Sequence, residues 1–187
     1  MSELHNKAEE GDLSAVKALI ESGINIDEKD SNDLTALHNA AYAGRFEIVE
    51  YLCGQGADLN LGNSKGYNPL MVASREGKDK IVFKLIQSGA HINHEDDEGF
   101  TALIMGAGYS MNPKVVDQLI NAGAELNKTT KTGGSALLWA TWFGQTENVR
   151  LLVKAGADKE LSLNGKTPLD LAKEKNLEEI QNILSWT

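Results

Sequence analysis

The chain has 187 residues, with 18 Lys and Arg against 27 Asp and Glu, so its formal net charge at pH 7 is −9. Hydrophobic residues make up 41% and charged residues 24%, which fits one folded domain and excludes disordered, collagen-like and disulfide-stapled chains. The acidic balance argues against nucleic-acid binding, which needs clustered Lys and Arg, and favours a protein partner with a basic surface.

Nothing near the N-terminus predicts export or membrane insertion. The first residues lack a charged-then-apolar signal pattern, and no apolar run reaches the roughly 18 residues of a membrane span. The single cysteine, Cys53, cannot form an intramolecular disulfide, so the fold does not depend on an oxidising compartment. We therefore expect a cytoplasmic protein without a membrane segment, unless a signal was removed and Met1 added.

The chain repeats itself with a period near 33 residues. Glycines spaced by 33, 33, 34 and 33 residues end the second apolar run of successive units: Gly23, Gly56, Gly89, Gly123 and Gly156. Leucines open the first runs at nearly the same period: Leu4, Leu37, Leu70, Leu103, Leu137 and Leu169. A fixed period of this length predicts a stack of similar units. We predict one domain over 1–187, with units at about 1–29, 30–62, 63–95, 96–129, 130–161 and 162–187.

Each unit predicts a short helix, a tight turn, a longer helix and a polar stretch. In the second unit, residues 35–41 predict the first helix and residues 48–53 the second. Apolar residues at i, i+3 and i+4 give each helix one buried face. Gly56 has the position of a residue that ends a helix with positive φ.

The first and last units have the polar outer faces of caps. Polar residues surround the first helix of unit one and continue along the last unit: Glu3, Asn6, Lys7, Glu10, Asp170, Lys173, Glu174 and Lys175. End units of a stack have one face without a neighbour, so polar residues are expected there. The last unit also lacks one residue within 158–165, to which we assign only a capping role.

Unit four carries one extra residue between its helices, within residues 109–113. Asn112 is expected to cap the second helix and Pro113 to occupy its first position. Gly106 and Gly108 weaken the first helix by roughly 1 kcal/mol each relative to Ala. A neutral insertion is favoured over a recognition bulge, and we expect unit four to open before its neighbours.

The residue pattern resembles the ankyrin repeat, Gly-x-Thr-Pro-Leu-His-x-Ala-Ala followed by Val-Val-x-x-Leu-Leu-x-x-Gly-Ala. Matching elements occur across the chain, namely Thr35 to Ala41, Asn68 to Leu70, Thr101 to Leu103, Ser135 to Leu137 and Thr167 to Leu169. Ser110 departs from the pattern, which has Gly at that place. The resemblance implies an all-α repeat protein, an ankyrin solenoid of β-turn fingers and antiparallel helix pairs.

The resemblance also implies binding through the finger tips and the first helices, on the concave face. The predicted partner-binding residues at those positions are Leu34, Tyr42, Tyr67, Arg75, Phe100, Tyr109, Trp142 and Phe143. Six of the 11 aromatic residues of the chain fall at these positions, and exposed rings are frequent binding hot spots. The alternative is that the rings only pack between neighbouring units. We assign four further rings, those of Trp139, Phe46, Tyr51 and Phe83, to structural positions.

Chemistry at a catalytic or metal site is not expected. His91 and His94 have a metal-like spacing but lie in a finger rather than on one helix face. His38 matches the structural histidine of the family, and Cys53 has a core position where we expect it to be inert. Residues 95–98 form an acidic finger opposite Lys128 and Lys131, a pattern typical of solvated turns. We predict no enzyme, no cofactor and no metal site.

The predicted function is therefore binding of one protein partner by a rigid monomeric stack. A stoichiometric inhibitor or an immunity-type protein is the leading hypothesis. A small adaptor that bridges two proteins is one alternative, and an enzyme with its active site in the groove is another.

Overall fold

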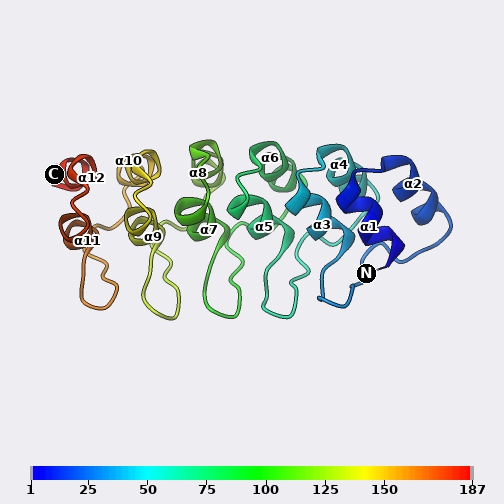
Figure 1. Ribbon diagram of the computed structural model, residues 1–187, viewed down its shortest axis with the longest axis horizontal. Coiled ribbons are helices and arrows are strands. Elements are labelled where there is room, and N and C mark those ends of the chain that lie inside the picture. The colour runs from blue at the N-terminus through cyan, green and yellow to red at the C-terminus, as the bar shows by residue number, and fades with distance from the viewer. Residues whose placement is uncertain (1, 186–187) are drawn as a thin grey trace.

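The computed structural model describes residues 2–185, and this part of the chain contains helices joined by turns and loops (Figure 1). Two or three residues separate the two helices of a pair, and longer loops separate successive pairs. The helices are α1 (Glu3–Glu10), α2 (Leu13–Glu21), α3 (Ala36–Ala43), α4 (Phe46–Gly54), α5 (Pro69–Arg75), α6 (Asp79–Gln87), α7 (Ala102–Tyr109), α8 (Pro113–Asn121), α9 (Ala136–Trp142), α10 (Thr146–Lys154), α11 (Pro168–Glu174) and α12 (Glu178–Ser185).

The helices form two rows, and the fingers project from one side of them (Figure 1). The even-numbered helices from α4 to α12 make one row, and α3, α5, α7, α9 and α11 make the other. Isolated antiparallel bridges join Thr129 to Ser135 and Leu163 to Lys166 in the last two fingers. The predicted solenoid of fingers and helix pairs is confirmed. We propose to keep the six predicted ranges as repeat bounds, since each contains one helix pair.

Side-chain caps start the first helix of each repeat from the second onward. A hydroxyl or amide oxygen accepts the backbone N–H three residues ahead, and the capping residues are Thr35, Asn68, Thr101, Ser135 and Thr167. These contacts satisfy N–H groups that have no partner within the helix. At the other end of the unit, Gly56 follows α4 with φ +82°, as its predicted position requires.

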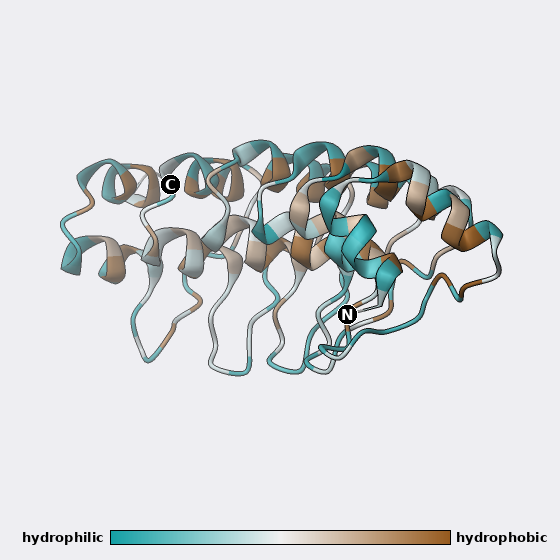
Figure 2. Cartoon of the chain, turned by 45° about the vertical axis from the view of Figure 1, so that its right-hand side comes forward, coloured by the Kyte–Doolittle hydropathy of each residue, from teal (hydrophilic) through white to brown (hydrophobic). Residues whose placement is uncertain are grey.

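The core lies between the two rows of helices. The core includes Leu37, Leu70 and Leu103 from the odd-numbered helices and Leu52 and Leu85 from the even-numbered helices, and each of these side chains is at most 1% exposed. Burying one such side chain contributes roughly 1.5–3 kcal/mol. Helix α1 is predominantly hydrophilic in Figure 2, and this polar character fits its position at the end of the stack.

Side-chain oxygens in the loops tie neighbouring repeats together. The carboxylate of Asp27 accepts the backbone N–H of Asp58, with 2.9 Å between Oδ1 and N. The equivalent bond recurs in each of the next three repeats, where a backbone N–H donates to an Asn Oδ1. The pairs are His91 N–H with Asn60 at 2.8 Å, Glu125 N–H with Asn93 at 2.9 Å and Asp158 N–H with Asn127 at 2.9 Å. This ladder fixes the spacing of the repeats along one edge of the stack.

The extra residue of the fourth repeat is accommodated without disturbing α8. Asn112 caps that helix and Pro113 opens it, as predicted. Met111 is 87% exposed, so the insertion adds its side chain to the solvent side. The amide of Asn112 also donates to the carbonyl oxygen of Gly77 at 3.0 Å and to Asp79 Oδ1 at 3.2 Å. These bonds join the inserted turn to the preceding repeat.

Opening of the fourth repeat before its neighbours stays a prediction. The expected result is faster amide hydrogen exchange in α7 and α8 than in α6 and α10, because two glycines raise the cost of ordering α7. Gly106 has a packing reason, since a Cβ there would lie 2.9 Å from Val115 Cγ1. Exchange measured by mass spectrometry checks the prediction, and slowest exchange within residues 114–121 would contradict it.

Candidate functional site

Hydrogen bonds within and between the fingers hold their shape. Asp96 Oδ1 accepts the backbone N–H groups of Glu98 at 2.9 Å and Phe100 at 2.7 Å. Asn63 makes the same turn one repeat earlier and Asp30 two repeats earlier. Backbone bonds link successive fingers, from Asp97 N–H to the carbonyl oxygen of Lys65 at 3.0 Å and from Lys131 N–H to that of Glu98 at 2.9 Å. The fingers therefore present a preformed surface.

Within the acidic finger, the four residues of 95–98 have different roles. Asp96 is 7% exposed and serves the turn. Glu95 Oε1 lies 2.5 Å from Lys128 Nζ on the next finger. Such an exposed pair contributes little to stability. Part of this charge run is thus used within the fold.

Three histidines support neighbouring fingers through Nε2. His5 contacts the carbonyl oxygen of Leu34 at 2.8 Å, His38 that of Tyr67 at 2.9 Å and His94 that of Gly66 at 2.9 Å. Burial lowers the pKa of His38 to about 4, so its ring is neutral at pH 7 and donates from Nε2. The structural role predicted for His38 is in place.

His91 and His94 lie in the same finger and do not form part of a metal-ligand cluster. Within residues 2–185, no group of three His, Cys, Asp or Glu side chains could hold a metal ion. His94 is used instead to contact the preceding finger.

We call the surface formed by the fingers and the odd-numbered helices the inner surface. One hollow of this surface is a groove of about 720 Å³ between the fingers of repeats two and three and helices α3 and α5. Four predicted binding residues line it, namely Leu34, Tyr42, Tyr67 and Arg75. Four carboxylates share this lining, those of Glu9, Asp30, Asp33 and Glu76, so we call it the acidic groove.

A second, smaller hollow adjoins the acidic groove. It has a volume of about 150 Å³ and is lined by Tyr67, Arg75, Phe100, Met105 and Tyr109; we call it the ring pocket. Burial and the nearby carboxylate of Asp96 raise the pKa of Tyr67, so its phenol stays protonated at neutral pH. Because Tyr67 and Arg75 line both hollows, the two are parts of one surface.

Four aromatic rings pack together next to the ring pocket. The ring centroid of Trp139 lies 5.6 Å from that of Phe100, 6.0 Å from that of Tyr109 and 5.9 Å from that of Phe143. Tyr109 and Phe143 are 5.0 Å apart. These separations are typical of favourable aromatic pairs. Tyr109 is 38% exposed and Phe143 44% exposed, so this ring cluster presents apolar surface to solvent.

Among the predicted aromatic residues, Tyr42, Tyr67 and Trp142 lie apart from the ring cluster. Trp142 is 43% exposed, and the ammonium of Lys175 lies 4.6 Å from its ring centroid. Tyr42 is 57% exposed in the acidic groove. The predicted aromatic residues thus divide among a groove, a four-ring cluster and one ring covered by Lys175 rather than forming a uniform row.

Three structural assignments made from the sequence need correction. Trp139 packs against the core but is only partly buried, and it is the central ring of the ring cluster. Phe83 is 53% exposed on α6. Cys53 is half-buried rather than enclosed, although burial raises the pKa of its thiol. Trp139 stands at the variable position of the motif, directly before the paired small residues Ala140 and Thr141. This position was the sequence feature that could have indicated a partly exposed ring.

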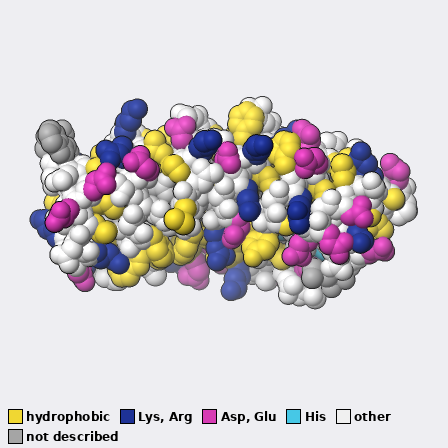
Figure 3. Space-filling view, turned by 45° about the horizontal axis from the view of Figure 1, so that its top comes forward, with side chains coloured by type: hydrophobic (Ala, Val, Ile, Leu, Met, Phe, Trp, Pro, Cys, Tyr) yellow, Lys and Arg dark blue, Asp and Glu magenta, His cyan; other side chains and the backbone are white. Residues whose placement is uncertain are grey.

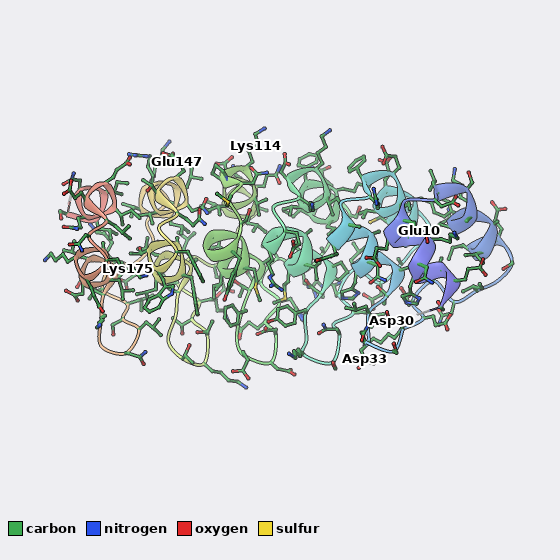
Figure 4. All side chains as sticks on the ribbon, viewed as in Figure 1. Glu10, Asp30, Asp33, Lys114, Glu147 and Lys175 are labelled. Atoms are coloured by element: carbon green, nitrogen blue, oxygen red, sulfur yellow. The ribbon has the colours of Figure 1, made fainter. Side chains whose placement is uncertain are left out.

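The opposite row of helices has no comparable aromatic cluster among the described residues. Lys, Arg, Asp and Glu side chains are interspersed with separate hydrophobic patches on the face seen in Figure 3. Figure 4 places Lys114 and Glu147 on this outer row, and Asp30 and Asp33 on a finger. No helix within residues 2–185 has the length and apolar character needed to cross a membrane.

The stacked helix pairs and linked fingers define a helical repeat protein with a preformed inner surface. A family model described as ankyrin repeats (3 copies) matches residues 4–96 and again residues 103–185. The chain therefore belongs to the ankyrin repeat family, whose members are generally protein–protein interaction modules and typically not catalytic.

A solved structure supports the same assignment. An ankyrin repeat domain from Acinetobacter baumannii AYE is 32% identical in sequence, with a TM-score of 0.87. The match covers 97% of this chain and 95% of that one. A comparison with curated proteins gives no match.

Proposed function

We propose that this protein is a non-catalytic binding module that holds one protein partner on its inner surface. The observation that carries the proposal is the ring cluster, because four rings from two successive repeats meet beside two hollows. Large rings that are already packed lose little conformational freedom on binding, and they are frequent hot spots.

We further propose that the module acts as a cytoplasmic monomer, as a stoichiometric inhibitor or an immunity-type protein. A rigid surface that covers part of its partner is suited to blocking it. An adaptor is the second candidate, because the exposed Phe83 on α6 gives the outer row an apolar residue of its own. An adaptor would hold a second protein there while the inner surface is occupied.

The test is affinity capture from the lysate of the native host with a ring variant, Tyr109→Ala/Phe143→Ala. Both rings are more than a third exposed, so we expect the fold to tolerate the change. The outer-row variant Tyr51→Ala/Phe83→Ala is the matched control, since it also removes two rings. We expect the ring variant to bind the captured partner at least about 30-fold more weakly, which corresponds to loss of about 2 kcal/mol.

Circular dichroism and a purified partner complete this experiment. If the ring variant is folded and captures the same proteins with unchanged affinity, the proposed binding surface is wrong. A partner lost only by the outer-row variant would identify an adaptor. An activity assay of the partner with and without one equivalent of the module then separates inhibition from bridging.

A further inference from the structure

The acidic groove carries negative charge that the fold does not neutralise. Its four carboxylates come from three repeats, and the cations in its lining are Lys65 and Arg75. The lining therefore has an excess of two negative charges. Among residues 2–185, the ion pairs include none with Glu9, Asp30 or Asp33.

Of the two nearby arginines, Arg75 contacts a ring and one groove carboxylate, and Arg45 contacts a backbone group. The guanidinium carbon of Arg75 lies 5.8 Å from the ring centroid of Tyr109, and its Nε is 3.9 Å from Glu76 Oε1. Arg45 donates from Nε to the carbonyl oxygen of Glu9 at 2.7 Å, so this contact is with the backbone and not with the carboxylate. A cation from outside would therefore enter a groove in which three of the four carboxylates, those of Glu9, Asp30 and Asp33, have no ion pair among the described residues.

The finger of repeat two holds the carboxylate of Asp30 in a fixed position. Asp30 Oδ1 accepts two backbone N–H groups, whereas Oδ2 is buried without a hydrogen-bond partner. Asp33, at the turn, has φ +60°. The exposed ring of Tyr42 lines the same groove and offers a face for a cation–π contact. The exposed carboxylates of Glu9 and Asp33 and this ring together suit a guanidinium or ammonium group.

We infer that the acidic groove receives an Arg or Lys side chain of the protein partner, while the ring pocket receives an apolar side chain of the same segment. This inference rests on the proposed function. Tyr67 and Arg75 line both hollows, so one continuous segment can reach the two. Adjacent helices lie about 8–10 Å apart and an extended chain advances about 3.3 Å per residue. The two side chains are then about three residues apart.

The test is a nuclear magnetic resonance titration of the full chain with acetyl-arginine amide and, separately, acetyl-citrulline amide. The two probes have nearly the same shape, but only the first is charged. We expect the arginine probe to shift the backbone amide signals of Asp33, Leu34 and Tyr67 saturably, and to bind at least about tenfold more tightly than the citrulline probe.

A groove variant, Glu9→Gln/Asp33→Asn/Glu76→Gln, removes three carboxylates, and Asn tolerates the positive φ of Asp33. The matched control, Glu21→Gln/Glu47→Gln/Asp117→Asn, removes the same charge from the even-numbered helices. We expect binding of the arginine probe to weaken about tenfold in the groove variant and to stay within twofold in the control.

Several results would overturn the inference: no saturable shift with the arginine probe, equal binding of both probes, or equal weakening in the two variants. The partner captured by the module separates this failure from failure of the proposed function. If the ring variant loses that partner and the groove variant binds it normally, only the cation site is wrong. If the ring variant keeps the partner, the proposed binding surface itself fails.

Discussion

Replacing Asn148 with Leu is expected to lower the free energy of unfolding by about 2–4 kcal/mol. Asn148 is 2% exposed, and its Nδ2 donates to the carbonyl oxygens of Ala107 at 3.0 Å and Ser110 at 3.3 Å. The carbonyl of Ala107 lies near the end of α7, the first helix of the fourth repeat, and that of Ser110 lies in the inserted turn. Leu fills similar space but leaves the two buried acceptors without this donor, and urea unfolding followed by circular dichroism measures the loss.

The cost is expected to depend on the insertion, and a double-mutant cycle tests this dependence. In a shortened background, Met111 is deleted and Ser110→Gly gives the turn the form that it has at Gly44 and Gly77. We expect Asn148→Leu to cost less than half as much there. If Asn148→Leu lowers the free energy of unfolding equally in both backgrounds, the amide of Asn148 stabilises the fold independently of the inserted turn. Asn182→Leu, at an exposed position of the last helix, is the control for the substitution itself.

The repeat pattern was enough to predict the fold, because glycine and leucine recur at nearly constant spacing and each repeat contacts mainly its neighbours. The contact made by Asn148 was beyond this reasoning. The corresponding place in other repeats is apolar, as at Ile48 and Ile81. On the largely polar helix α10, however, one more polar residue does not indicate a buried contact. Only the position of the inserted turn, 38 residues earlier in the sequence, explains it.

The candidate surface was predicted in composition but not in arrangement. The positions expected from the repeat pattern include Phe100, Tyr109 and Phe143, and all three belong to the ring cluster. Trp139 was assigned to the core because its place was taken as a core apolar position of the ankyrin pattern. The acidic groove was also missed, since its carboxylates come from separate repeats and gather only when the fingers are stacked.

The protein is expected to lose stability between about pH 6.5 and pH 4 through His38. Burial lowers the pKa of this residue to about 4 in the folded chain, against about 6.5 when unfolded. Within this window the unfolded chain takes up a proton that the folded chain does not, so the free energy of unfolding falls as the pH falls. The loss approaches about 3 kcal/mol near pH 4 and grows little below it.

Carboxylates also titrate in this range, so the contribution of His38 is obtained by difference. His38→Gln removes the titrating group and keeps an amide donor toward the carbonyl oxygen of Tyr67. Urea unfolding at pH 7.0, 5.5 and 4.5 is expected to give a shallower pH dependence for this variant, while the exposed His91→Gln retains the full slope. Parallel pH curves for the wild type and His38→Gln would mean that His38 is protonated in the fold, which requires Nδ1 to release the backbone N–H of Thr35 that it now accepts.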